Sequence, residues 1–243
     1  PAAAESFALA GVPGQPALTA RALSAYLEAE TVMRDVAPGC YLSWRTLAAI
    51  GAIEGAHGQY GGRQLGFDGR PDEDIVGLRL DGVAVDNFGL AVANMPDTDG
   101  GRWDGDPVYD RAVGPMQFIP QTWARWGRDG DGDGEADPQD LDDAALAAGA
   151  YLCNYGSLRA WDGWSVAVFG YNHAAAYVNA VQARLLEVQR LRLPDFEGDE
   201  QLRQSLPGGA FVPLEPPPEE VPPGETPPGE TPPGETVSEP AGG

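Results

Sequence analysis

The spacing of hydrophobic residues predicts two helices near the start of the chain. Between residues 16 and 36, apolar side chains recur every three or four positions, the spacing of one helical face. The glycine of Pro38-Gly39 ends this helix, and Ser43 suits the N-cap of a second helix that runs to Glu54. Glycines follow at positions 55 and 58, as expected after a helix C-terminus.

The middle of the chain lacks a sustained hydrophobic period. Residues 60–110 are rich in Gly and Asp, with short apolar stretches at 75–80 and 83–92. We interpret this segment as long loops with little regular structure. Loops of this length in a compact domain usually form a functional surface.

The second half of the chain returns to helical spacing. Pro120 suits the first turn of a short helix that stops at Gly127, and an Ala-rich helix is predicted over 141–155. A last helix or pair of helices spans 165–193, interrupted near 170–172. The pattern therefore predicts a mainly α domain with long loops.

The two ends of the chain differ in composition from the part between them. Residues 1–15 are rich in Ala, Gly and Pro and are expected to be irregular, residues 16–194 form one folded domain, and residues 195–243 are rich in Pro and Glu, with three PPGET repeats. Such a tail cannot bury enough apolar surface to fold, so we expect disorder. Both a wall-spanning tether and a tail without function remain open. No apolar run approaches the ~20 residues of a membrane helix, so no transmembrane segment is expected.

Acidic residues dominate the charge of the chain. The formal net charge is −22, with fifteen Arg and no Lys, and the acids concentrate in residues 129–143 and 195–243. An acidic surface repels phosphate groups, so no nucleic-acid partner is expected.

Glu54 is the first candidate for chemistry. It lies four residues after Ile50 and seven after Leu47, so a carboxylate falls on the apolar face of its helix. Burial would raise its pKa, as a general acid near neutral pH requires. Alternatively, Glu54 turns to solvent or pairs with an Arg. His57, one turn later, either forms a hydrogen bond near Glu54 or is exposed in a Gly-rich loop.

A second candidate is the stretch Gly114-Pro-Met116-Gln117-Phe-Ile-Pro-Gln-Thr-Trp123. A small-residue turn presents Met and Gln before a proline-started helix. Met packs on flat apolar faces, and the Gln amide can donate to and accept from an acetamido group. Taken alone, the stretch could equally be a loop-to-helix junction.

Three motifs together resemble those of a known family. The Glu54 helix, the Met116-Gln117 stretch and Phe169-Gly-Tyr171-Asn172-His173 are similar, in order, to the motifs of lysozyme-like lytic murein transglycosylases. The most similar group is the membrane-bound transglycosylase B type of actinobacteria, over about residues 16–190. The resemblance implies a goose-type lysozyme or soluble lytic transglycosylase fold. Glu54 would be the catalytic acid, Met116 and Gln117 would line the groove, and Tyr171 and Asn172 would support Glu54 or the sugar. A helix kink with an internally satisfied Asn is the alternative for the last two residues.

The reaction implied by the resemblance uses one carboxyl group. The enzyme would cleave the MurNAc-β-1,4-GlcNAc bond of peptidoglycan strands and form 1,6-anhydromuramoyl ends without consuming water. Hydrolysis is the alternative if Asp99, Asp104, Asp106 or Asp110 faces Glu54 across the groove, because most glycosidases use two carboxylates. A non-catalytic peptidoglycan-binding protein and a calcium-regulated interaction protein are further alternatives.

The resemblance also implies a bacterial protein that is secreted or associated with the cell wall. No organic cofactor is implied, and we expect a monomer.

The acidic loop 129–140 has the spacing of an EF-hand. Positions 1, 3, 5, 7, 9 and 12 are acidic, with Gly134 at the turn, which favours oxygen ligation of Ca²⁺. Asp140 stands where a bidentate Glu is usual, and an acidic loop without metal is the alternative. The family carries a calcium loop at this place, so the resemblance implies a structural ion. The expected ligands are Asp129, Asp131, Asp133, Glu135 and Asp140.

Two further sets of residues have less specific signals. Trp103 and Tyr109 lie in an Asp-rich segment where the family places a groove-bordering loop, so they are candidates for stacking on sugar rings. The Asp residues around them could equally form turns.

Cys40 and Cys153 are the only cysteines. Export would favour a disulfide between them, although two separately buried thiols are also possible, and the absence of CxxC spacing argues against a zinc or redox site.

Overall fold

A computed structural model describes residues 17–189, so the expectations for 1–15 and for the tail 195–243 lie outside the described residues. The predicted mainly α domain is confirmed. The described part of the chain holds no helix long and apolar enough to cross a membrane. The helices are α1 (Ala20–Val36), α2 (Trp44–Glu54), α3 (Pro120–Trp126), α4 (Leu141–Cys153), α5 (Trp161–Tyr171) and α6 (Ala175–Val188), with short 3-10 turns η1 (Pro38–Cys40), η2 (Ala56–Gly58) and η3 (Tyr60–Gly62).

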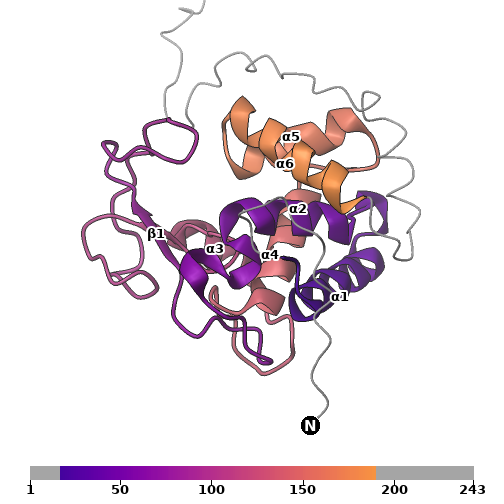
Figure 1. Cartoon of the computed structure of the whole chain (residues 1–243), viewed down its shortest axis with the longest axis horizontal. Helices are drawn as coiled ribbons and strands as arrows, with labels where there is room; N and C mark the ends of the chain where they lie inside the picture. Colours follow the sequence, from indigo (N-terminus) through magenta and orange to yellow (C-terminus); the bar gives the residue numbers. More distant parts are fainter. Residues whose placement is uncertain (1–16, 190–243) are drawn as a thin grey trace, which may run out of the picture.

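The helices form the core around α2. Figure 1 shows α2 lying between α1 and the α5–α6 pair, with β1 and the long loops to the left of these helices. Buried alanines on α1 and α4 allow these two helices to pack closely, and the large side chains of Tyr26, Trp44 and Trp164 are fully buried. One hydrophobic core therefore holds the C-terminal end of α2 in place.

Side chains at the helix starts explain why α2 and α4 begin where the sequence predicts, whereas α1 begins at 20 and not 16, and α5 begins at 161 and not 165. The Ser43 hydroxyl accepts a hydrogen bond from the backbone N–H of Arg45 and caps α2. Thr19 caps α1, and Asp140 caps α4. Each cap satisfies an N–H group that has no partner within its helix.

The segment between η3 and α3 contains more structure than the predicted long loops. Strands β1 (Val76–Arg79) and β2 (Arg111–Val113) pair antiparallel. Between them, bridges at Asp81–Asn94 and Val85–Ala91 close residues 81–94 into a hairpin. Strands of three and four residues are too short to give a clear alternating pattern, so the sequence did not reveal them.

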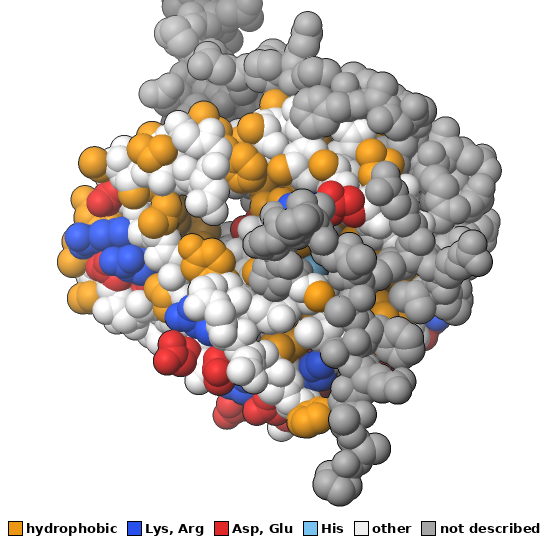
Figure 2. Space-filling view, in the orientation of Figure 1, with side chains coloured by type: hydrophobic (Ala, Val, Ile, Leu, Met, Phe, Trp, Pro, Cys, Tyr) orange, Lys and Arg blue, Asp and Glu red, His pale blue; other side chains and the backbone are white. Residues whose placement is uncertain are grey.

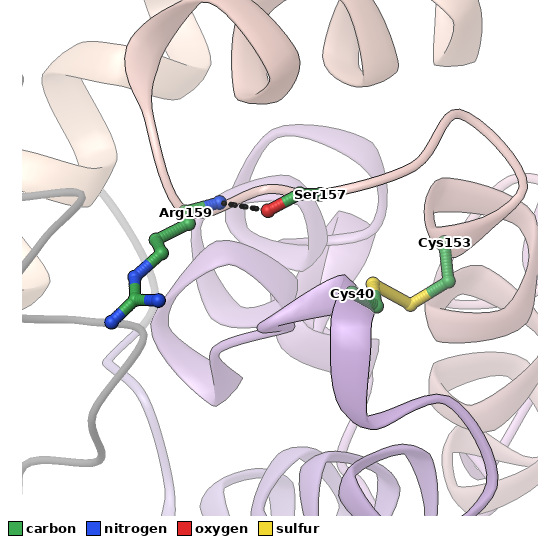
Figure 3. The surroundings of a disulfide bond; sticks show 4 residues. All are labelled: Cys40, Cys153, Ser157 and Arg159. Carbon is green, nitrogen blue, oxygen red and sulfur yellow. Dashed lines mark hydrogen bonds between the residues drawn. A yellow bond between two sulfur atoms is a disulfide. The ribbon is translucent and has the colours of Figure 1, made fainter.

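The predicted disulfide is present. Cys40, at the end of η1, is bonded to Cys153, the last residue of α4, across 113 residues of sequence. Figure 3 shows the bond beside the turn where the backbone N–H of Arg159 donates to Ser157. The backbone N–H of Leu158, in the loop after α4, also donates to the carbonyl of Cys40, so a disulfide and a hydrogen bond both hold η1 against this part of the chain.

Candidate functional site

The position of Glu54 depends on two glycines on one side of α2. A Cβ atom on Gly51 would lie 2.1 Å from the hydroxyl of Tyr26, and one on Gly55 would lie 2.4 Å from the carbonyl oxygen of Pro115. Side chains at these positions would push α1 and the turn before Gln117 away from α2. The glycines therefore bring the end of α2, with Glu54 as its last residue, against that turn.

Glu54 lies in the wall of a cavity of about 910 Å³. The hydroxyl of the buried Tyr177, on α6, donates a hydrogen bond of 2.5 Å to Oε1 of Glu54. Burial raises the pKa of Glu54 to about 7, and the hydrogen bond from Tyr177 opposes that rise. The carboxyl group can therefore hold or release a proton near neutral pH, which is the property of a general acid.

Tyr177 is a site residue that the sequence did not reveal. It lies on an apolar helix, where a tyrosine is expected to be a core residue. The signal that could have identified it is its hydroxyl, because a buried hydroxyl needs a hydrogen-bond partner. Its ring stacks on Tyr171 at 6.5 Å and meets the edge of Phe88 at 5.9 Å. The ring is thus held on two sides while its hydroxyl holds Glu54.

His57 lies behind the site. It is buried and its Nδ1 lies 3.1 Å from the hydroxyl of Tyr26, so it takes neither of the places considered from the sequence. Burial and the charge of Arg184 lower its pKa to about 4, which leaves the ring neutral at physiological pH. His57 also has a left-handed backbone, with φ of 59°.

Backbone strain concentrates at the site. Of the four described non-glycine residues with positive φ, three flank Glu54: Ala56, His57 and Gln117. Each such residue costs on the order of 1–3 kcal/mol, and strain of this kind often occurs in binding and catalytic sites. The turn after α2 and the turn at Gln117 are therefore held by the surrounding core.

Gln117 lines the cavity, but Met116 does not. The Gln117 amide donates to the carbonyl of Gly114 at 3.0 Å, and its Oε1 lies against Gly77 of β1. Met116 is fully buried beneath Gly51 of α2, which corrects the expectation that it lines the groove. The tight turn directs these neighbouring side chains to opposite sides, so only Gln117 reaches the cavity.

Tyr171 and Asn172 both line the cavity, where the chain breaks between α5 and α6. The Tyr171 hydroxyl donates to the carbonyl of Met116 at 2.8 Å and so fixes the turn opposite Glu54. Asn172 is the C-cap of α5, and its backbone carbonyl accepts from Ala174. Tyr171 therefore supports the site through the Met116 turn, and the Asn172 side chain borders the cavity.

Trp103 and Tyr109 lie outside the lining of this cavity, so their stacking on sugar rings stays a prediction. The guanidinium of Arg102 covers the Trp103 ring at 4.4 Å, and that of Arg79 covers Tyr109 at 4.7 Å. Each guanidinium covers one face of its ring in a cation–π contact.

The acidic residues of this segment form turns and ion pairs. None of Asp99, Asp104, Asp106 and Asp110 lines the cavity. Asp110 accepts from the backbone and side chain of Thr98, and Asp106 pairs with two arginines. Asp86 is the other carboxylate in the lining, and its Oδ1 accepts from the backbone N–H groups of Phe88 and Leu90.

The acidic loop before α4 gathers a different set of carboxylates from the expected one. Oxygens of Asp129, Asp131 and Asp143 lie within 4.8 Å of one another. Asp140 instead accepts from the backbone N–H of Asp142 and caps α4. Because α4 begins directly after it, the Asp140 side chain turns toward the helix, and Asp143, one turn later, faces the loop. The expected ligands Asp133 and Glu135 lie in the same exposed loop, outside this cluster.

The electrostatics of this loop fit a divalent cation. Burial, together with the charges of Asp131 and Asp129, raises the pKa of Asp143 to about 6. Clustered carboxylate oxygens are the ligands that Ca²⁺ prefers, and a bound cation would remove their repulsion. The loop also contacts the site, because the buried Gln139 side chain accepts from and donates to the backbone of Ile75, just before β1.

A comparison of the sequence with known protein families finds a match. A family model described as a transglycosylase SLT domain matches residues 107–205. The match includes Gln117, Tyr171 and Tyr177 but not α2 with Glu54, and it covers less than half of the chain. It supports a lytic transglycosylase family, and the helical architecture is consistent with the lysozyme-like fold of such domains. A search of curated proteins finds no match.

Proposed function

We propose that the protein is a lytic transglycosylase that cleaves the MurNAc-β-1,4-GlcNAc bond of peptidoglycan, with Glu54 as its acid. The observation that carries the proposal is the Glu54 carboxyl group, which lines the cavity, has a pKa raised to about 7 and is held by Tyr177. The partial match to the transglycosylase SLT domain supports peptidoglycan as the substrate. Such a substrate places the site of action outside the cytoplasm.

In this mechanism, protonated Glu54 donates its proton to the glycosidic oxygen as the bond to C1 of the muramoyl residue breaks. The resulting carboxylate then accepts the proton of the C6 hydroxyl while that oxygen attacks C1 and forms the anhydro ring. The donor from Tyr177 stabilises the carboxylate form between these two steps. Glu54 regains its proton from the C6 hydroxyl, and because that hydroxyl attacks C1 in place of water, the reaction consumes no water.

The cavity favours a mechanism with one catalytic carboxyl group over hydrolysis. Hydrolysis would need a second carboxylate to act as base or nucleophile. The other carboxylate in the lining, Asp86, holds the hairpin turn through two backbone N–H groups. Mass spectrometry of digested peptidoglycan distinguishes the outcomes, because an anhydro end is lighter than a hydrolysed end by one water molecule.

Substitution of Glu54 tests the proposal directly. Glu54→Gln keeps the size of the side chain and an acceptor for Tyr177 but removes the proton donor. We expect release of soluble fragments to fall by about 10²–10⁴-fold with binding to peptidoglycan retained. Glu28→Gln, an exposed substitution on α1, is the matched control and should retain full activity. Residual activity of Glu54→Gln above about one part in a hundred would remove Glu54 from the role of acid.

Binding without cleavage would indicate another class of protein. If the wild type sediments with peptidoglycan but releases no fragments from it, the protein is a wall-binding module. The cavity and the raised pKa of Glu54 are not needed for such a role. Fragment release and sedimentation should therefore be measured on the same samples.

We also propose that the acidic loop binds a structural Ca²⁺ through Asp129, Asp131 and Asp143. A ligand at 100 times its Kd stabilises the folded state by about 2.7 kcal/mol, or about 5–10 °C in Tm for a domain of this size. We expect a chelator to lower the Tm of the wild type by this amount. In Asp143→Asn the chelator should change little, whereas Asp140→Asn, which keeps a side-chain acceptor for the cap of α4, should keep the wild-type response. An unchanged wild-type Tm would contradict the proposal.

A further inference from the structure

One wall of the cavity consists of exposed aliphatic side chains. Val76, Leu78, Val85 and Leu90 line the cavity and are 38%, 48%, 58% and 46% exposed. We call these four residues the aliphatic wall; they come from β1 and the hairpin 81–94. Figure 2 shows hydrophobic side chains around a hollow on this face. Contiguous exposed apolar side chains usually mark a binding surface.

The hairpin that carries half of this wall is held beside Glu54. The backbone N–H of Asp86 donates to the carbonyl of Leu90, and the side chain of Asp86 accepts two N–H groups of the same turn. Phe88, at the tip, packs its ring against Tyr177, the residue that holds Glu54. The aliphatic wall and the reacting carboxyl group therefore belong to one surface.

The formally charged side chains in the cavity lining are acidic. Its described lining includes the carboxylates Glu54 and Asp86 and one histidine, His173, but no Arg, and the chain has no Lys. A ligand carboxylate that entered this lining would lose hydration without gaining an Arg or Lys partner, and Asp86 would repel it. The cavity therefore favours an uncharged, methyl-rich ligand over an anionic one.

We infer that the cavity selects muramoyl residues that carry a stem peptide over those with a free lactyl carboxylate, an inference that rests on the proposed function. An amide bond to the first amino acid removes the charge of the lactyl group. The methyl groups of the lactyl unit and of a first alanyl residue can then pack on the aliphatic wall. The wall offers no hydrogen-bonding side chain, so it recognises such groups by burial of apolar area.

The test compares two forms of one substrate. Soluble glycan fragments that bear peptides are assayed beside the same fragments after an amidase has removed the peptides and freed the lactyl carboxylates. We expect wild-type kcat/KM to be about tenfold higher on the peptide-bearing form. Added salt should reduce this preference because it screens the repulsion from Asp86.

Three variants assign the preference to its parts. Leu78→Asn, or Leu90→Asn if the first does not fold, should lower the ratio of the two kcat/KM values about fivefold, mainly by raising KM on the peptide-bearing form. Asp86→Asn keeps an oxygen acceptor for the turn and should improve cleavage of the stripped form about threefold. Val166→Asn changes an exposed residue of α5 outside the cavity and should leave the ratio unchanged.

Two results would overturn the inference while leaving the proposed function intact. One is equal or better cleavage of the stripped fragments by the wild type. The other is a loss in Leu78→Asn that is the same for both substrates. If neither form yields any cleaved product, the proposed function itself fails.

Discussion

Replacement of Tyr177 by Phe should shift the pH dependence of the enzyme. The substitution removes one hydroxyl, the donor of the 2.5 Å hydrogen bond to Oε1 of Glu54, and keeps the ring between Tyr171 and Phe88. Burial raises the pKa of Glu54 to about 7, and the hydrogen bond opposes this rise. Without the bond, the charged form loses its partner and the pKa must increase.

The magnitude follows from the strength of the lost bond. A hydrogen bond to a charged group contributes about 1.5–3 kcal/mol, and one pKa unit corresponds to about 1.4 kcal/mol. The neutral acid also forms a weaker bond with the tyrosine, which offsets part of this difference. We therefore expect the pKa of Glu54 to rise by about one unit.

The sign of the shift follows from the role proposed for Glu54. A general acid works in its protonated form, so activity falls as the pH rises through its pKa. In Tyr177→Phe the descending limb of kcat/KM should move about one unit toward alkaline pH. The maximal rate should fall about tenfold, because the carboxyl group is no longer held in one orientation.

The assay is release of soluble fragments from peptidoglycan, measured as a pH profile of kcat/KM. Tyr26→Phe is the matched control: it also removes a buried hydroxyl, but that hydroxyl contacts His57 and not Glu54. Its descending limb should coincide with that of the wild type. A limb that stays in place or moves to lower pH in Tyr177→Phe would refute the reasoning.

Three other variants test the contacts that support the core and the site. Replacing Cys40 and Cys153 by Ser opens a link across 113 residues and should cost about 3–5 kcal/mol, seen as a Tm lower by about 10 °C; a Tm equal to that of the wild type would show that the core alone holds these helices. Gly55→Ala places a methyl group 2.4 Å from the carbonyl oxygen of Pro115 and should reduce kcat far more than binding; unchanged kcat would mean that the turn shifts freely. Phe88→Ala removes the edge contact on the tyrosine that holds Glu54 and should lower kcat about threefold without unfolding, as far-UV circular dichroism would check.

Local patterns in the sequence determined the helices and the position of Glu54. Apolar spacing and the Ser43 cap predicted α2 to its last residue, and Pro120 and Gly127 marked the ends of α3. These signals act within one or two turns, so they can be read without knowing what packs against the helix. The cysteine pairing needed one further premise, an oxidising environment, and the structure contains the bond.

Only the tertiary structure decided which side chains meet at the site. Tyr177 and Glu54 are 123 residues apart, and the hydrogen bond between them exists because α6 packs on α2. The inward direction of Met116 depends on close contact with Gly51, which its own segment does not encode. Asp143 joins Asp129 because α4 begins at Leu141 and turns Asp140 toward the helix. Periodicity and caps specify elements, whereas the contacts between elements depend on the packing of the whole core, and the chemistry of this protein lies in those contacts.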